Sequence, residues 1–218
     1  MQKFIFIIAM TMVLIPATLK GSQDTLAHKH RTLIMGVPQH LFDNGVRIEI
    51  DKRLPRQNQW ITLAPTLYYR GQRGNYFGNY DLYGMKGMGM EVFLRHFLLD
   101  QPEPEGFYLS AGAGYRYLQL RHRGDSWNEY MENGLTYYDY NARVWDRQTH
   151  SFTLKGTLGY QTILNRHLLI DLFMGVGLRW SEQTIPSDIV LIHDTGDVFS
   201  YNFRGFLYVV GGRVGIGW

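Results

Sequence analysis

The sequence of 218 residues contains no cysteine, which excludes disulfides, thiolate metal sites and a lipid-modified cysteine. Proline is scarce, with 7 residues, and no apolar run reaches the roughly 20 residues that a membrane-spanning helix needs. The catalytic patterns G-x-S-x-G and H-E-x-x-H and the phosphate-binding P-loop do not occur. The net charge of +3 is spread along the chain without a basic block, so nothing indicates binding to nucleic acid.

Glycine is frequent, at 24 residues, and aromatic residues make up 15% of the chain. The last stretch, 206–218, reads FLYVVGGRVGIGW and alternates between an apolar side and a side of small or charged residues. This period of two is the pattern of a β-strand. Tyr208 and Trp218 lie ten residues apart on the apolar side. A tilted strand of that length rises about 25 Å, the height of the apolar band on a membrane barrel with aromatic edges.

The N-terminal residues 1–22 have the composition of a secretory signal peptide. Lys3 supplies the positive charge, and the apolar core FIFIIAMTMVLI is followed by Pro16 and Ala17. This core of twelve residues is shorter than the roughly 20 that cross a bilayer as a helix. We therefore expect cleavage between residues 17 and 27, and a single domain over residues 23–218.

Seven further segments show strand patterning and are separated by turn residues: 32–37, 45–54, 59–70, 84–98, 107–120, 151–164 and 167–181. Their connections alternate in length, short at 55–58, 99–106 and 164–167, and long at 71–83, 121–147 and 182–199. Membrane barrels have an even number of strands, short turns in the periplasm and long loops outside. The sequence therefore predicts an all-β fold, an antiparallel up-and-down transmembrane β-barrel of eight strands with short periplasmic turns and long extracellular loops.

Two of these strands are less clearly defined than the others. In segment 59–70 the more apolar face leaves Trp60 and Tyr68 on the opposite side, so the register stays open. Pro65 in the same segment cannot donate a ladder hydrogen bond, which predicts a bulge. The short segment 32–37 must pair with the last strand if the barrel is to close.

The side of each strand opposite the apolar face carries charge. If the apolar faces contact lipid, ten charged residues point into the lumen, six positive and four negative: Arg47, Glu49, Asp51, Glu91, Arg95, Arg116, Lys155, Asp171, Arg179 and Arg213. An eight-stranded barrel has an interior just wide enough for side chains to fill. We expect these residues to form a charge network that fills the lumen, so that the barrel is not an open pore.

Aromatic residues also occur near the ends of the predicted strands, where membrane barrels carry their interface girdles. Six residues are predicted at the two interfaces: Phe107, Tyr117, Tyr160, Trp180, Tyr208 and Trp218.

A C-terminal amphipathic strand that ends in Trp or Phe resembles the assembly signal of bacterial outer-membrane β-barrels. The stretch VPQHLFDNGVRIEIDKRL, followed by WITLAPTLYY, is similar to the start of small barrels from Gram-negative bacteria. The chain thus resembles a small eight-stranded outer-membrane barrel of the OmpA-like or OmpX-like type, in a porin-like group. The resemblance implies residence in the cell outer membrane, contact with its lipid and lipopolysaccharide, and insertion by the barrel-assembly machinery.

Two alternatives stay open. With the apolar faces turned inward, the same pattern describes a soluble exported ligand-binding barrel of the lipocalin type. Otherwise the barrel is a lipid-modifying or proteolytic enzyme of the outer membrane, with polar candidates at its outer rim: His122, Asp125, Ser126, His150, His193 and Asp194. Their spacing matches no catalytic motif, so we expect no catalytic residue, no metal and no cofactor.

The longest predicted loop, 121–147, mixes Trp and Tyr with acidic residues, a composition typical of binding surfaces. The same composition suits an extended hairpin above the membrane whose aromatic residues pack on one another, and we favour this interpretation. The tripeptide Arg123-Gly124-Asp125 matches a cell-adhesion motif but is also ordinary turn chemistry. A surface partner is expected to bind through this segment.

Overall fold

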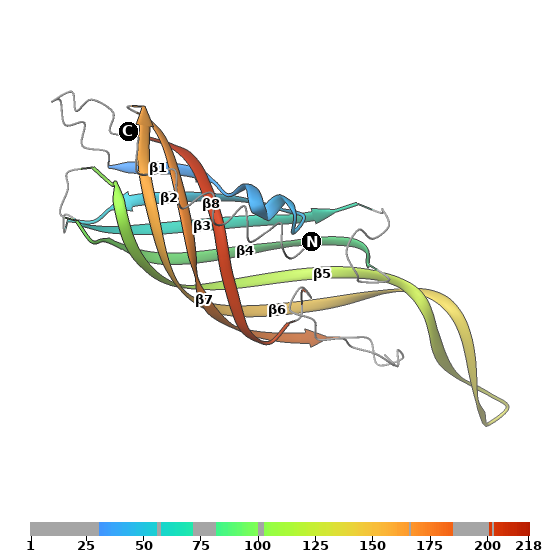
Figure 1. The fold of residues 1–218 in the computed structure, drawn as a ribbon. Helices are drawn as coiled ribbons and strands as arrows, with labels where there is room; N and C mark the ends of the chain where they lie inside the picture. Colours follow the sequence, from blue (N-terminus) through green and yellow to red (C-terminus); the bar gives the residue numbers. More distant parts are fainter. Residues whose placement is uncertain are drawn as a thin grey trace, which may run out of the picture.

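The computed structural model describes residues 31–55, 58–71, 82–99, 103–165, 167–184, 201 and 203–218. The predicted signal peptide, residues 1–22, lies outside them, and so does most of the two predicted loops 71–83 and 182–199. Eight strands follow one another around a closed ring (Figure 1): β1 (Thr32–Gly36), β2 (Gly45–Arg53), β3 (Gln59–Arg70), β4 (Leu82–Phe97), β5 (Gly106–Glu132), β6 (Leu135–Asn165), β7 (Leu168–Thr184) and β8 (Gly205–Gly217). Within the described residues, no helix is long and apolar enough to cross a membrane.

The strands pair antiparallel in chain order, and β1 pairs with β8 to complete the ring. The predicted eight-stranded, up-and-down antiparallel β-barrel is therefore confirmed. The bounds of β3 match the prediction, and those of β1, β2 and β8 differ from it by one residue. We call the end with the short connections 54–58, 98–105 and 166–167 the turn end, and the opposite end the loop end.

The apolar face of each strand points away from the barrel axis. On β2, Val46 and Ile48 are exposed, whereas Arg47, Glu49 and Asp51 between and beyond them are buried inside. The same alternation continues around the ring, because side chains on a strand point to opposite faces in turn. A barrel with its apolar faces inside, as the soluble alternative requires, is not what the structure shows.

The strand whose register the sequence left open, β3, is placed by its two neighbours. Trp60 and Tyr68 are buried inside the barrel, and Leu67 on the other face is exposed. The predicted bulge at Pro65 is wrong, because β3 keeps one register with β4 along its whole length. Its ladder with β2 is interrupted at Pro65 and resumes in the same register. The missing N–H thus removes a rung of the ladder without adding a residue.

The β1–β8 pairing that closes the ring is short. β1 has only 5 residues, and its pairing with β8 ends at Gly36↔Val214. The chain then forms the 3₁₀ segment η2 (Pro38–Leu41), which contacts both β2 and β8. Gln39 Oε1 accepts a hydrogen bond from the backbone N–H of Gly212 at 3.4 Å. At the loop end, the wall between β2 and β8 is therefore completed by η2.

β5 and β6 continue past the barrel as a long two-stranded ribbon (Figure 1). They pair without a break as far as Glu132↔Leu135 and turn at Asn133 and Gly134, whose φ angles are 52° and 79°. Two successive residues with positive φ form a type I′ turn, for which Asn-Gly is a favoured sequence. The prediction of an irregular loop at 121–147 is therefore wrong, and the segment is an extended hairpin whose aromatic residues pack on one another, as we favoured.

Candidate functional site

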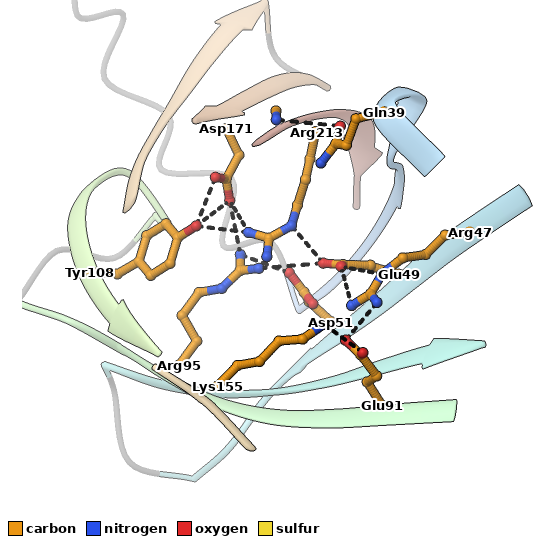
Figure 2. A network of polar contacts seen from close by, with 11 residues as sticks. Gln39, Arg47, Glu49, Asp51, Glu91, Arg95, Tyr108, Lys155, Asp171 and Arg213 are labelled. Carbon is orange, nitrogen blue, oxygen red and sulfur yellow. Dashed lines mark hydrogen bonds and ion pairs between the residues drawn. The ribbon is translucent and has the colours of Figure 1, made fainter. Parts of the chain in front are cut away.

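The inward-facing charged residues meet in the middle of the lumen. Arg213 on β8 contacts two carboxylates: its Nη1 lies 2.9 Å from Asp171 Oδ2, and its Nε lies 2.7 Å from Glu49 Oε2. Asp171 is the direct cross-strand neighbour of Arg213, whereas Glu49 reaches it from β2, on the far side of β1. Figure 2 shows these side chains converging from different strands.

Arg95 on β4 enters the same group from the opposite wall. Its Nη1 lies 2.9 Å from Asp51 Oδ2 and 3.5 Å from Asp171 Oδ2, and it donates to Gln161 Oε1 at 2.9 Å. The guanidinium lies over the ring of Tyr108, 4.5 Å from its centroid. The Tyr108 hydroxyl donates to Asp171 at 2.7 Å. One cation therefore connects side chains from β2, β5, β6 and β7 across the lumen.

A second group of charges lies nearer the loop end. Glu91 on β4 accepts hydrogen bonds from Arg47 on β2 and from Lys155 on β6, each at 2.6 Å. Arg47 Nε also donates to Glu49 Oε1 at 2.8 Å, which joins the two groups into one network. Gly114 makes room for this arrangement, since an added Cβ there would lie 2.4 Å from the Glu91 side chain.

The joined network holds four cations and four carboxylates: Arg47, Arg95, Lys155 and Arg213 with Glu49, Asp51, Glu91 and Asp171. Their side chains are 15% exposed or less, so each charge depends on its partners and not on water. An unpaired charge in such a place is strongly unfavourable. Because cations and anions balance, the network occupies the lumen without a net buried charge.

The structure does not bring the other two predicted lumen residues, Arg116 and Arg179, into this network. Both lie toward the loop end on inward-facing positions of β5 and β7. Arg116 Nη2 donates to the backbone carbonyl of Tyr201 at 3.0 Å, and its guanidinium lies over the rings of Tyr68 and Tyr201. Among the described residues, Arg179 forms no ion pair. These two cations are the surplus of the six positive and four negative charges predicted from the sequence.

Two apolar clusters inside the barrel flank the network, and sequence reasoning missed both. One lies at the turn end and comprises Leu33, Met35, Trp60, Phe97, Tyr108 and Leu169. The other lies at the loop end and comprises Tyr68, Leu82, Met85, Leu118 and Leu120, with Tyr201 packed against it. The sequence did hold a signal for these clusters. Large residues occupy inward positions, and small residues stand opposite them on the neighbouring strand. An added Cβ at Gly159, for example, would lie 2.2 Å from the Tyr108 ring.

The six predicted interface aromatics lie near the two ends of the barrel. Phe107 and Tyr160 are cross-strand partners at the turn end with ring centroids 4.9 Å apart, and Trp218 lies at the same end. The other three, Tyr117, Trp180 and Tyr208, lie toward the loop end. Each group is outward-facing, with Phe107, Trp180, Tyr208 and Trp218 exposed.

The rim residues considered for an enzyme do not form a catalytic arrangement among the described side chains. His122 stacks on Trp145, whereas the His150 ring bonds to Tyr115 on the outward face of the barrel. The two histidines lie on opposite faces of the sheet. The side chains of Asp125 and Ser126, and residues His193 and Asp194, are outside the described part of the chain.

The adhesion-like tripeptide Arg123-Gly124-Asp125 lies within strand β5, so its interpretation as a turn is wrong. Residues 121–132 carry polar side chains on both faces, so no alternation marked this part of β5 as a strand. The strong Asn-Gly turn at 133–134 then ends the hairpin.

Comparison with known proteins finds a similarity in structure. No family model matches this sequence, and no curated protein matches it. The crystal structure of CarO from Acinetobacter baumannii matches over 87% of this chain and 98% of that chain. The two share 10% sequence identity, and the TM-score is 0.44. A similarity of this degree carries no functional inference.

Proposed function

We propose that this chain is an integral β-barrel of the bacterial outer membrane, with a side-chain-filled lumen and a structural or surface-interaction role. The observation that carries the proposal is that the barrel wall is apolar on its outer side and charged on its inner side, the reverse of a soluble barrel. Large apolar side chains on the strands face outward and stay exposed, as for Leu67 at 66%, Met88 at 63% and Val210 at 68%. A belt of this kind is unfavourable in water and suits the hydrocarbon region of a bilayer.

In this proposal the turn end faces the periplasm and the β5–β6 ribbon extends from the cell surface. Residues 31 and 218 lie at the turn end, where Arg31 N–H bonds to the Trp218 carbonyl at 2.9 Å. This placement suits an exported chain that the barrel-assembly machinery inserts from the periplasm. Outer-membrane lipid and lipopolysaccharide are the partners of the outward face, and the aromatic groups at the two ends anchor its edges.

The contents of the lumen support a closed barrel. Between the turn-end and loop-end clusters, the eight paired charges connect opposite walls, so ions would have to break several short contacts to pass. We therefore expect no stable large conductance when the pure protein is inserted in planar bilayers. Steps of nanosiemens size from pure protein would contradict the closed lumen.

Membrane residence is tested separately, by fractionation and by gel mobility with and without boiling. A folded membrane barrel in detergent runs anomalously fast until it is boiled. The expected result is recovery in the outer-membrane fraction together with this heat-dependent shift. Recovery of the native protein in the soluble periplasmic fraction, without the shift, would contradict the proposal.

The proposal assigns no catalytic activity to the barrel. It is supported by the positions of His122 and His150, which face opposite sides of the sheet. Lipid A from cells with and without the gene is compared by mass spectrometry. The same acyl pattern in both is expected, and an altered pattern would favour the enzyme alternative.

A further inference from the structure

In the residues that the structure describes, the distal part of the ribbon has two strand edges without a neighbouring strand. β4 pairs with β5 only as far as Leu82↔His122, and β7 pairs with β6 only as far as Thr184↔Gln148. Beyond these pairs, β5 and β6 pair only with each other within the described part of the chain. Among the described strands, each outer edge therefore has backbone N–H and C=O groups that another strand can use.

Exposed aromatic side chains cover the distal ribbon, residues 127–140. Trp127 and Tyr140 are cross-strand partners with ring centroids 5.0 Å apart, and Tyr130 stacks on Tyr137 at 5.5 Å. All four rings are more than two-fifths exposed, and Tyr138 is 62% exposed. The two ring pairs lie on opposite faces, since 127 and 130 differ by an odd number of residues on one strand. Both faces thus offer open aromatic surfaces.

Charge on the ribbon is segregated along its length. The distal residues 127–140 include Glu129, Glu132 and Asp139, all exposed, and no Lys, Arg or His. The base of the ribbon has the opposite sign, with four arginines and a single aspartate over residues 121–123 and 143–147. Glu129 stands directly opposite Tyr138, so a carboxylate and an open ring share one site on the surface. This combination attracts a cation both by charge and through the face of the ring.

We propose that the distal ribbon binds an extended, Lys/Arg-rich segment of a partner protein, which adds as a strand to one free edge. Backbone pairing supplies affinity, while the carboxylates and rings select cationic side chains at alternate positions of the bound strand. An anionic lipid or polysaccharide is disfavoured by the acidic charge, and a second copy of the same ribbon is disfavoured by like-charge repulsion. The inference rests on the proposed exposure of the ribbon at the cell surface.

The test uses the full-length barrel in detergent and a fluorescent peptide of alternating Lys and Thr. Fluorescence anisotropy is expected to show binding that weakens as salt is added, and no binding of the matched peptide in which Glu replaces Lys. Methylating alternate backbone nitrogens of the Lys peptide should abolish binding, because the added strand loses its ladder donors. Equal binding of the Glu peptide, or full binding of the methylated one, would overturn the proposal.

Variants locate the contact on the ribbon. The triple variant E129Q/E132Q/D139N is expected to weaken binding by on the order of tenfold, because it removes three exposed charge contacts whose small binding free energies add. Trp127→Ala should weaken it as well. Glu105→Gln is the control and should leave affinity unchanged, because Glu105 lies at the turn end, where its carboxylate accepts from Thr162 Oγ1. A triple variant with unchanged affinity would overturn the proposal.

Failure of this inference can be told apart from failure of the proposed function. A protein that shows the heat-dependent gel shift and does not bind the Lys peptide is a membrane barrel without this partner. Preferential binding of lipopolysaccharide vesicles through the same three carboxylates, or dimerisation through the ribbon, would likewise contradict the cationic partner. Loss of the gel shift would instead remove the proposed function itself.

Discussion

Gln39 Oε1 accepts a hydrogen bond from the Gly212 backbone N–H at 3.4 Å, and this contact joins η2 to β8 where β1 has already ended. Gly211 leaves the space for it, because an added Cβ there would lie within 3 Å of both Gln39 and Phe173. In lipid, a strand edge without backbone partners is costly. At this seam a side chain therefore partners the Gly212 N–H, in place of a strand.

Replacing Gln39 by Ala should weaken the seam. We expect the variant to lose about 1 kcal/mol of stability, the usual contribution of a hydrogen bond. Amide exchange in β8 should become faster over residues 205–213 than over 214–217, which β1 covers. The measurements are urea titration followed by gel shift, and hydrogen exchange by mass spectrometry. Leu41→Ala on the same segment, whose side chain is exposed, is the control; equal effects of the two variants would contradict the role of Gln39.

Arg95→Met should be far more damaging than the loss of an exposed arginine. The substitution leaves the buried Asp51 carboxylate without its cation, and breaking a buried pair costs roughly 3 to 5 kcal/mol. Arg121→Met, which breaks an exposed pair with Asp146, is the matched control and should have little effect. Urea midpoints in detergent measure both. Adding Asp51→Leu to the Arg95→Met variant should restore part of the lost stability. A double variant no more stable than Arg95→Met would show that the unpaired Asp51 carboxylate is not the cause of the destabilisation.

The turn at the ribbon tip depends on the conformation of Gly134. Its φ of 79° is disfavoured for residues with a branched side chain, so Gly134→Val should strain the turn and loosen the tip. Cleavage by chymotrypsin at the exposed tyrosines of the distal ribbon should become faster, while the barrel remains resistant. Gly156→Val is the control, since an added Cβ at Gly156 meets nothing within 4 Å. Similar cleavage rates for the two variants would argue against a turn-dependent ribbon.

The base of the ribbon should respond to acid. Arg121 donates to Asp146 at 2.9 and 3.2 Å, and these hydrogen bonds hold the pKa of Asp146 below its ordinary value of 3.8. A lowered folded pKa means that the ionised pair stabilises the ribbon base above about pH 4, and that this contribution is lost as pH falls through the folded pKa. This contribution is measured by amide exchange near Arg121 as a function of pH, in the wild type and in Asp146→Asn. The same pH dependence in both proteins, after correction for intrinsic exchange, would show that the Arg121–Asp146 pair does not stabilise the ribbon base.

Much of the barrel follows from local patterns in the sequence. Alternation on β2 alone is enough to separate Val46 and Ile48 from Arg47 and Glu49, because successive side chains on a strand point to opposite faces. Turn residues and the rhythm of short and long connections give the number of strands and their antiparallel order. The Asn-Gly pair at 133–134 was a further local signal, and it marks the tip of a ribbon where a loop was predicted.

What the sequence determined by itself was therefore which side of each strand is apolar and which carries charge. Which charges meet depends on the closed fold. Arg95 and Asp171 come from opposite walls, and Gln39 fills a gap that exists because β1 stops at Gly36. Such relations depend on ring closure and register, which bring together residues far apart in the chain, and a repeat of two residues holds no information about distances across the lumen.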